Sequence, residues 1–335
     1  MNARIVGVVI PYFQRQPGLL TLALASIGNQ SVLASRSARI RVAIVDDSSP
    51  YPLSDELKDY VAPPGVELLT KLQANGGAGA ARNAALELLQ DSCDVIAFLD
   101  SDDTWSPDHL ERALIALDSG ADFYFSDANR GEDGPSENAD APPWFTGSLQ
   151  AISALADPLF CYSGNTDVVI VKGLVPTSSV IVHRWLPEST ARFPSRYFRF
   201  GEDQYYCLKF LSLGGKIAYS PKVEVACGRG VNIFAGNVPG SESARLCLMD
   251  EIAYRNDALN TLALSREADS HIRSKLAEAR QSALQQGLWF ALDGQFSWIM
   301  RSIRRHPSLL TGLSGAAWSV LRTALRHRAA SSKQI

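Results

Sequence analysis

Cysteine is scarce in this sequence and shows no pairing pattern. The 335 residues include five cysteines, an odd number, which lie far apart and never form a C-x-x-C pair. A disulfide framework or a zinc knuckle requires paired or closely spaced cysteines, so the sequence predicts neither. A reducing compartment, the cytoplasm, is the simplest expectation.

Long apolar stretches and the signatures of several protein classes are missing as well. The apolar run 5–10 is too short for the core of a signal peptide, and 306–321 falls short of the roughly 20 apolar residues of a membrane-spanning helix. No H-E-x-x-H pair and no G-x-S-x-G elbow occurs, which disfavours a zinc protease and a serine hydrolase. The formal net charge of −3 indicates no nucleic-acid partner.

The sequence does contain the composition and alternation of an α/β protein. It is 46% hydrophobic and 20% charged, as globular domains are. Runs rich in β-branched residues at 5–10, 42–45 and 95–99 alternate with helical spacing of Leu, Ile and Ala at 19–27 and 80–89. This order predicts a Rossmann-like, mostly parallel central sheet flanked by helices.

The second half of the chain predicts a less regular arrangement, followed by helices. Strands are expected at 178–182 and 216–219 and a helix at 203–213, whereas 129–143 has almost no large apolar side chain. We expect that segment to be a mobile surface loop, either a lid or an insertion. After residue 240 the spacing predicts helices over 244–263 and 267–284, punctuated by Gly287 and Gly294.

The strongest chemical signal is FLDSDDTW at 98–105, where an apolar strand delivers Asp100 and Asp102 as a D-x-D pair. Hard divalent ions such as Mg²⁺ and Mn²⁺ prefer carboxylate oxygens and keep open positions for substrate phosphates. The same acids also suit a cap on the helix that follows near Pro107. The spacing alone leaves both interpretations open.

Two further segments carry residues suited to binding a nucleotide. Asp46 and Asp47 in VDDSSP have oxygens that can accept hydrogen bonds from a nucleobase or a ribose, although D-D-S-S is also a common turn. The segment NGGAGAARN at 75–83 is a glycine-rich turn into a helix, whose N–H groups favour a phosphate, with Arg82 as a positive charge. It is not the dinucleotide fingerprint, because Arg82 stands where G-x-G-x-x-G needs glycine.

A last motif, FGED at 200–203, places Glu202 and Asp203 at the start of a predicted helix. Negative charge is favourable there, so plain capping accounts for both residues. The alternative is that a carboxylate at this point deprotonates an acceptor hydroxyl as a general base.

In order, VVIPYFQR (8–15), VDDSSP (45–50), NGGAGAARN (75–83), FLDSDDTW (98–105) and FGED (200–203) resemble the motifs of glycosyltransferase family 2. Within it, QRQPGLLTLALASIGNQ (14–30) and CGRGVNIFAG (227–236) look most like bacterial succinoglycan-type exopolysaccharide glucosyltransferases. The resemblance covers roughly residues 4–235. It implies a GT-A fold, a UDP-sugar donor, UDP-glucose by preference, Mn²⁺ or Mg²⁺ as cofactor, and inversion at the anomeric carbon.

The resemblance also assigns parts of the chain and single residues. A catalytic domain would span 1–235, with a nucleotide-sugar half (1–125) and an acceptor half (126–235), and 236–335 would be a helical extension. Asp203 would be the catalytic base with Glu202 beside it, and Asp102 with Asp100 would hold the metal. The nucleotide-sugar contacts would come from Pro11, Tyr12, Asp46, Asp47, Asn75, Gly77, Arg82, Asp100, Ser101 and Arg229.

The basic C-terminal region bears on where the acceptor is found. Residues 294–335 hold seven Lys and Arg and no Asp or Glu, mixed with Trp, Phe and Leu as in interfacial amphipathic helices. We expect it either to contact the anionic inner leaflet of the inner membrane, near a polyprenyl-diphosphate-linked saccharide acceptor, or to pack on the catalytic domain or in a homodimer.

Two other functions remain open at this point. A sugar nucleotidyltransferase also needs a strand-end acid and a metal, but its glycine-rich loop after the first strand is replaced here by PYFQR at 11–15. A catalytically silent UDP-sugar-binding component of a polysaccharide assembly complex would not need to retain both D-x-D and E-D.

Overall fold

The computed structural model of the chain describes residues 3–89, 93–130, 134–152, 155, 157–183, 192–212, 214–228, 230 and 241–292. By contacts, the chain forms two compact units. The first comprises residues 1–198, 202–232 and 262–265, and the second comprises 199–201, 233–261 and 266–335. Each unit is described by itself.

The first part of the sheet confirms the predicted alternation of strands and helices. Its elements are β1 (Arg4–Tyr12), α1 (Leu19–Gly28), α2 (Ser31–Ala34), β2 (Ala38–Asp46), α3 (Leu53–Glu56), β3 (Val66–Leu72), α4 (Ala78–Leu88) and β4 (Val95–Phe98). The strands are all parallel, in the order β3-β2-β1-β4. The edge strand β3 was not predicted, because its residues are only partly buried or exposed and form no apolar run.

The same sheet continues with mostly antiparallel strands. The elements are β5 (Thr104–Trp105), α5 (His109–Asp118), β6 (Phe123–Arg130), α6 (Pro143–Thr146), β7 (Leu149–Ala151), β8 (Phe160–Tyr162), α7 (Thr166–Val171), the 3-10 turn η1 (Thr177–Ser179), β9 (Ile181–His183), α8 (Glu202–Leu211) and β10 (Ile217–Cys227). The order runs on from β4 as β9-β6-β10-β8-β7, and β5 pairs with β10. The parallel sheet expected from the sequence therefore accounts for the N-terminal strands, and β6 with β10 adds one further parallel pair.

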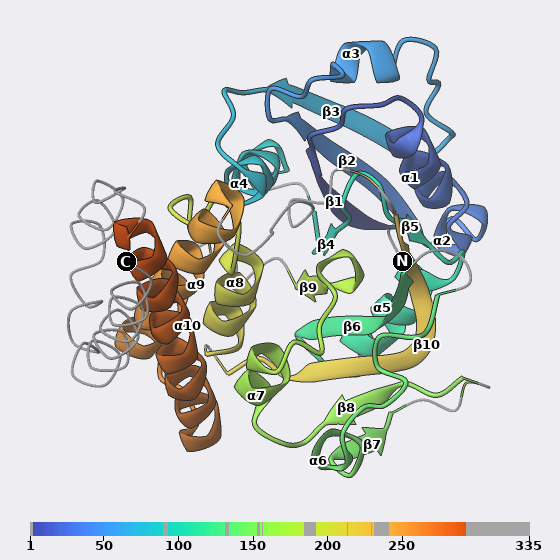
Figure 1. The fold of residues 1–335 in the computed structure, drawn as a ribbon. Helices are drawn as coiled ribbons and strands as arrows, with labels where there is room; N and C mark the ends of the chain where they lie inside the picture. The colour runs from blue at the N-terminus through green and yellow to red at the C-terminus, as the bar shows by residue number, and fades with distance from the viewer. Residues whose placement is uncertain are drawn as a thin grey trace, which may run out of the picture. The chain divides into compact units, whose positions relative to one another are not determined.

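Helices cover both sides of the N-terminal strands, as a doubly wound sheet requires. Figure 1 shows α4 on one side of β1 and β2, and α1 with α2 on the other. The strand residues between them are fully buried, for example Val8, Val42 and Ala97 at 0% exposure. Because both faces are covered, these strands consist of near-continuous apolar runs, which is why the sequence predicted them.

Three segments differ from their prediction. The segment 129–143 begins inside β6, and its part from 134 onward is tethered, since the Asp127 carboxylate accepts hydrogen bonds from Ser136 Oγ and from the Asn138 N–H. The predicted strand at 178–182 starts later, because 177–179 form the η1 turn. Gly287 does not end a helix but lies within α10.

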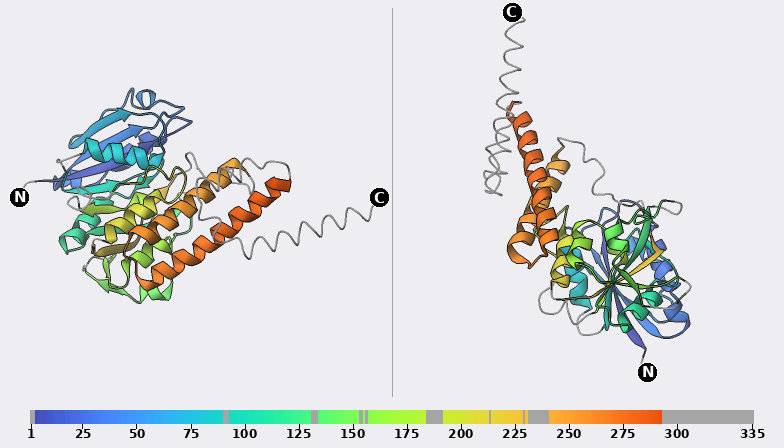
Figure 2. Two further views of the ribbon diagram at one scale, coloured as in Figure 1. Left: turned by 90° about the vertical axis from the view of Figure 1, so that its left-hand side faces the viewer. Right: turned by 90° about the horizontal axis from the view of Figure 1, so that it is seen from below.

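The second unit contains two long helices, α9 (Glu242–Thr261) and α10 (Arg266–Leu292); α9 lies close to its predicted bounds, and α10 continues past the predicted end at 284. Figure 2 shows them side by side. They share a small apolar core that includes Ile252, Leu276 and Ala279. No helix among the described residues combines the length and apolar character needed to cross a membrane. The basic region 294–335 lies outside the described residues.

Candidate functional site

The carboxyl ends of three adjacent parallel strands bring the predicted acids to one edge of the sheet. Strands β2, β1 and β4 are neighbours, and Tyr12 at the end of β1 pairs with Asp46 at the end of β2. Asp100 follows two residues after β4. Ligands of open α/β sheets bind beyond this edge, so the predicted acids lie where a ligand is expected (Figure 1).

Asp46 and Asp47 are buried and each binds the main chain around it. Asp46 Oδ1 accepts a hydrogen bond from the Ser49 N–H at 2.7 Å, and its Oδ2 accepts one from the Leu53 N–H at 2.9 Å. Asp47 accepts three hydrogen bonds, from Gln73 Nε2 and from the N–H groups at 76 and 77, each at 2.8 Å. An ionised carboxylate offers about four acceptor positions, so both retain capacity for a further donor.

The glycine-rich loop before α4 is shaped by these contacts. Asn75 Nδ2 donates to the Asp47 carbonyl at 2.9 Å, and Gly77 has a φ of 85°, a conformation that favours glycine. A Cβ at position 77 would also lie 3.1 Å from the Phe198 ring. The loop that was predicted to receive a phosphate is therefore fixed in place by Asp47.

The residues at the end of β1 pack under this edge of the sheet or hydrogen-bond to the D-x-D loop. Tyr12 is fully buried and its hydroxyl donates to the Tyr51 carbonyl at 3.0 Å, so its side chain belongs to the core under the edge. Pro11 pairs in register with Val45 and is partly buried. Ser101 Oγ accepts a hydrogen bond from Gln14 Nε2 at 2.9 Å, which links the D-x-D loop to the end of β1.

Arg82 connects the two acidic motifs. It is 4% exposed, and its guanidinium donates to Asp100 Oδ1 at 2.8 Å and to Glu202 Oε1 at 3.0 Å. Gly79, one turn earlier on α4, allows this approach, because a Cβ there would lie 3.1 Å from Glu202 Cγ. The D-x-D loop after β4 and the N-terminus of α8 thus share one buried cation.

The α8 start presents two acids in different settings. Asp203 is partly exposed, and its Oδ2 accepts a hydrogen bond from Thr177 Oγ1 at 2.9 Å while its Oδ1 accepts one from the Gln204 N–H. Glu202 is buried. Burial and the negative charge of Asp203 raise the pKa of Glu202 to about 7, against the opposing effect of Arg82.

The other two acids of the D-x-D loop are held by the residues that follow β10. Asp102 Oδ2 accepts from the Gly230 N–H at 2.7 Å, and Asp103 Oδ1 accepts from the Gly228 N–H at 2.8 Å. Burial, joined by the charge of Asp100, raises the pKa of Asp102, and the same causes raise the pKa of Asp103 to about 7. Arg229 lies outside the described residues.

The carboxylates of the D-x-D loop are the candidate ligands for a divalent ion. Within the described residues, no three His, Cys, Asp or Glu side chains gather closely enough to hold a metal between them. Asp100 and Asp102 nevertheless offer hard oxygen donors, and burial first, with the charge of Asp100 in addition, raises the pKa of Asp102. Mg²⁺ and Mn²⁺ commonly bind through one or two carboxylates plus substrate phosphates and water, so the two residues fit.

Sequence reasoning missed several residues of this site. Thr177 Oγ1 donates to Asp203, Ser178 Oγ donates to Asp103 Oδ2 and accepts from the Asp100 N–H, and Gln14 donates to Ser101. Thr177 and Ser178 lie in the η1 turn, which no motif marks, and Gln14 lies in the motif at 8–15 without having been predicted as a site residue. Gly228 and Gly230 lie in the segment 227–236, which was noted for its resemblance to the family. The site residue predicted there was Arg229, which stands between them.

Residues 7–164 match Glycosyl transferase family 2. The succinoglycan biosynthesis protein ExoW of Rhizobium meliloti (strain 1021) is 40% identical over 126 residues, which cover 37% of this chain and 38% of ExoW. The chain thus matches well under half the length of this curated relative.

Solved structures resemble the whole chain at low sequence identity. S. aureus TarS 1–349 in complex with UDP-GlcNAc has a TM-score of 0.53 at 17% identity, covering 91% of this chain and 90% of that one. The mannosyltransferase PcManGT from Pyrobaculum calidifontis, in complex with GDP-Man and Mn²⁺, has a TM-score of 0.55 at 15% identity, covering 97% and 87%. With the sheet and its strand-end acids already described, residues 7–164 form a glycosyl transferase family 2 domain, and the chain has the GT-A fold.

Proposed function

We propose that this protein is an inverting glycosyltransferase that moves glucose from UDP-glucose to a saccharide acceptor in exopolysaccharide biosynthesis. The observation that carries the proposal is the linkage of the D-x-D loop and the E-D pair through Arg82, at the sheet edge where ligands bind. Nucleotide-sugar transfer needs a cation-binding acid for the leaving group and a base for the acceptor, and this edge brings both together. The name of ExoW points to the same biosynthetic class.

Asp203 is the general base in this proposal. Among the E-D pair it is the more exposed carboxylate, and Thr177 and the Gln204 N–H orient it. It takes the proton of the acceptor hydroxyl while that oxygen attacks the anomeric carbon from the face opposite the diphosphate. One displacement forms the new glycosidic bond, breaks the bond to UDP and inverts the anomeric centre. Glu202 holds Arg82 beside it.

The donor is proposed to bind along the three strand ends. Asp46 or Asp47 accepts a hydrogen bond from the base, since both retain acceptor capacity. The loop at Asn75 and Gly77, whose N–H groups at 76 and 77 donate to Asp47, leads into α4, and the N–H groups in the first turn of α4 are proposed to face the phosphates. Asp102 with Asp100 would hold Mn²⁺ or Mg²⁺, and an ion held there would supply positive charge for the departing diphosphate. Arg229 is proposed to assist the diphosphate.

The acceptor is proposed to be linked to a polyprenyl diphosphate. A cavity of about 430 Å³ adjoins α4 and α8 and is lined by Asn83, Arg192, Phe193, Pro194, Ser195, Arg196, Tyr205 and Lys209. Three of these residues are cationic and none is acidic. Cations in this number suit a diphosphate, because charge-assisted hydrogen bonds to phosphate are among the stronger polar contacts.

The substitution Asp203→Asn tests the assigned base. The amide cannot accept the proton, so kcat should fall about 10²–10⁴-fold, the usual contribution of a general base, while UDP-glucose binds as in the wild type. The measurement is UDP release from UDP-glucose with Mn²⁺ and a lipid-linked oligosaccharide fraction as acceptor. Asp118→Asn, which changes an exposed carboxyl at the end of α5, serves as the control. Near-normal UDP release by Asp203→Asn would show that another group is the base.

A further inference from the structure

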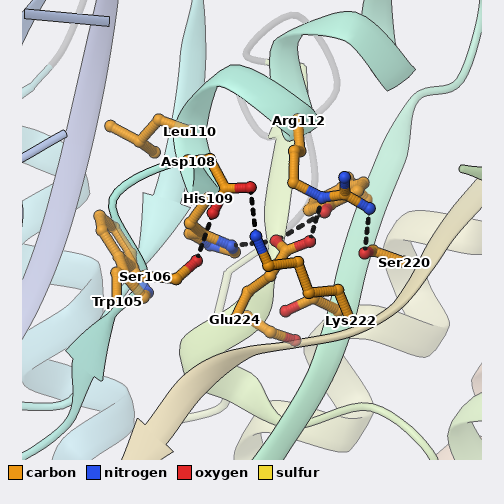
Figure 3. Close-up of polar contacts among 12 residues, drawn as sticks. Trp105, Ser106, Asp108, His109, Leu110, Arg112, Ser220, Lys222 and Glu224 are labelled. Carbon is orange, nitrogen blue, oxygen red and sulfur yellow. Dashed lines mark hydrogen bonds and ion pairs between the residues drawn. The ribbon is translucent and has the colours of Figure 1, made fainter. Parts of the chain in front are cut away.

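A buried polar cluster lies beneath the D-x-D loop and has no part in the proposed reaction. It consists of Glu224 on β10, His109 and Arg112 on α5, Tyr124 on β6 and Ser220 on β10, and Figure 3 shows the side chains of α5 and β10 meeting at Glu224. Glu224 is 1% exposed, His109 and Tyr124 are 0% exposed and Arg112 is 4% exposed. Burying a carboxylate this completely is costly unless it is paired and hydrogen-bonded.

The Glu224 carboxylate is paired on both oxygens. Oε1 accepts from Arg112 Nε at 2.5 Å, while Oε2 accepts from His109 Nδ1 and from the Tyr124 hydroxyl at 2.8 and 2.7 Å. An ionised carboxylate can only accept, so Nδ1 is the protonated nitrogen of His109. Burial opposes ionisation, but these donors lower the pKa of Glu224 below its usual range. The cluster therefore joins α5, β6 and β10 through one charged group.

The second observation is an irregularity of β10 at the same place. Its pairing with β6 shifts register between Ser220 and Val223 and again between Val223 and Val225. Val223 pairs with Asp127 and Val225 with Ala128, so Glu224 is an extra residue on β10 between two neighbouring residues of β6. Bulges of this kind redirect side chains and are found beside active sites. Here the bulge turns Glu224 into the interior.

Beyond the bulge, β10 pairs with β5, the strand that follows the D-x-D loop. This ladder has only two residue pairs, Val225 with Trp105 and Ala226 with Thr104. So short a ladder specifies its own register weakly. The cluster anchors both of its strands, because the Ser106 N–H donates to the Glu224 carbonyl at 2.8 Å and the His109 N–H donates to the Ser106 carbonyl.

The register of this ladder decides where the end of β10 meets the acids. The N–H groups of Gly228 and Gly230 bind Asp103 and Asp102, and a Cβ at Gly228 would come 1.8 Å from the Asp102 carbonyl oxygen. The two segments are in such close contact that a shift of one residue cannot be absorbed. Sequence positions 224 and 228 are separated by only three residues, so a displacement of the first is transmitted to the second.

We propose that the Glu224 cluster is a positioning device that fixes the β5–β10 register and thereby holds the Gly228 and Gly230 N–H groups against Asp103 and Asp102. Through these contacts it orients the D-x-D loop for the cation and the nucleotide diphosphate. This last consequence rests on the proposed function, whereas the fixing of the register does not.

Two variants of the full chain test the proposal. Glu224→Gln keeps the shape of the side chain but removes its charge, and Tyr124→Phe removes one donor while the ion pair to Arg112 stays. Leu114→Ala is the matched control, because it removes a buried side chain from α5 without touching the carboxylate. Hydrogen exchange at the amides of 224–230 is measured beside calorimetric titration with UDP and Mn²⁺.

We expect faster exchange at Gly228 and Gly230 and about 10–100-fold weaker UDP–Mn²⁺ binding in Glu224→Gln, a smaller effect in Tyr124→Phe, and neither in Leu114→Ala. Unchanged exchange in Glu224→Gln, or the same change in Leu114→Ala, would overturn the proposal. If the wild type binds no UDP with or without Mn²⁺, the proposed function fails, and the exchange result alone decides the role of the cluster.

Discussion

At the scale of single residues, the site is governed by an imbalance of charge around Arg82. One guanidinium serves Asp100 and Glu202 directly, and Asp203 lies beside them. The acids hold the pKa of Arg82 above its usual range despite its burial. Burial raises the pKa of Glu202, and the negative charge of Asp203 raises it further against the opposing effect of Arg82.

The raised pKa of Glu202 predicts how stability depends on pH. Its pKa is about 7 in the folded protein, against an ordinary value of 4.5. Between these values the folded state binds a proton that the unfolded chain does not, so the free energy of unfolding should fall as pH rises from about 5 to about 7. Glu202→Gln cannot titrate and should lose this part of the slope. Urea denaturation at several pH values, without divalent ions, measures it.

The control for this prediction is Glu251→Gln, which removes a glutamate paired with Arg255 on α9. It should keep the pH slope of the wild type. An identical slope in Glu202→Gln and the wild type would mean that Glu202 is ionised throughout this range, and the charge imbalance would then be borne by another acid.

At the scale of elements, the loop between β3 and α4 is held by the carboxylate of Asp47. The carboxylate accepts from Gln73 Nε2 and from two main-chain N–H groups, of Gly76 and of the buried Gly77. A buried N–H that loses its acceptor costs about 1–3 kcal/mol. The loop is expected to lie near the phosphates of the UDP-sugar. A change that disorders the loop should therefore also weaken binding of the UDP-sugar.

Asp47→Ala should therefore release the loop. We expect faster hydrogen exchange across 73–77 and a loss of about 1–3 kcal/mol in the free energy of unfolding, with weaker binding of UDP. Asp122→Ala is the control, because that carboxylate also accepts from a main-chain N–H, of Lys216, in the other half of the sheet. Protection of 73–77 that is the same in Asp47→Ala as in the wild type would contradict the assignment.

The elements that could be predicted from the sequence are those whose buried residues form an apolar run or a helical repeat of apolar residues. Strands β1, β2 and β4 are covered on both faces and were predicted within a few residues, as were α1, α4, α8, α9 and the start of α10, which runs eight residues past its predicted end. The edge strand β3 and the two-residue strand β5 lack an apolar run, and the bulge in β10 depends on a tertiary contact of Glu224. The order of apolar and polar residues along the chain therefore does not predict these two strands or the bulge.

The candidate site divides in the same way. The acids were found because each follows a strand or starts a helix, positions that local sequence marks. Their partners were not found, because Gln14 with Ser101 and Thr177 with Asp203 are brought together only by the packing of distant segments. The sequence also predicted a phosphate contact for Arg82, whereas the structure shows its guanidinium committed to two carboxylates.

At the scale of the whole molecule, the basic region 294–335 predicts attachment to an anionic surface. Each Lys or Arg near such a surface contributes about 1 kcal/mol, and the region has seven. The full chain should float with vesicles that contain anionic lipid, and the binding should be lost at high salt. A variant with Arg301, Arg304 and Arg305 changed to Gln should bind more weakly. If the amount of protein that floats with vesicles depends neither on anionic lipid nor on salt, the proposed attachment to an anionic membrane is wrong.

The central claim is that the D-x-D loop holds a cation on which nucleotide-sugar binding depends. Calorimetric titration of UDP-glucose into the wild type and Asp102→Ala, each with and without Mn²⁺, tests it most directly, with Asp118→Asn as the control. We expect Mn²⁺ to strengthen the binding of UDP-glucose to the wild type and to Asp118→Asn, and we expect this dependence to disappear in Asp102→Ala. Equal affinity with and without Mn²⁺ in the wild type, or full Mn²⁺ dependence in Asp102→Ala, would contradict it.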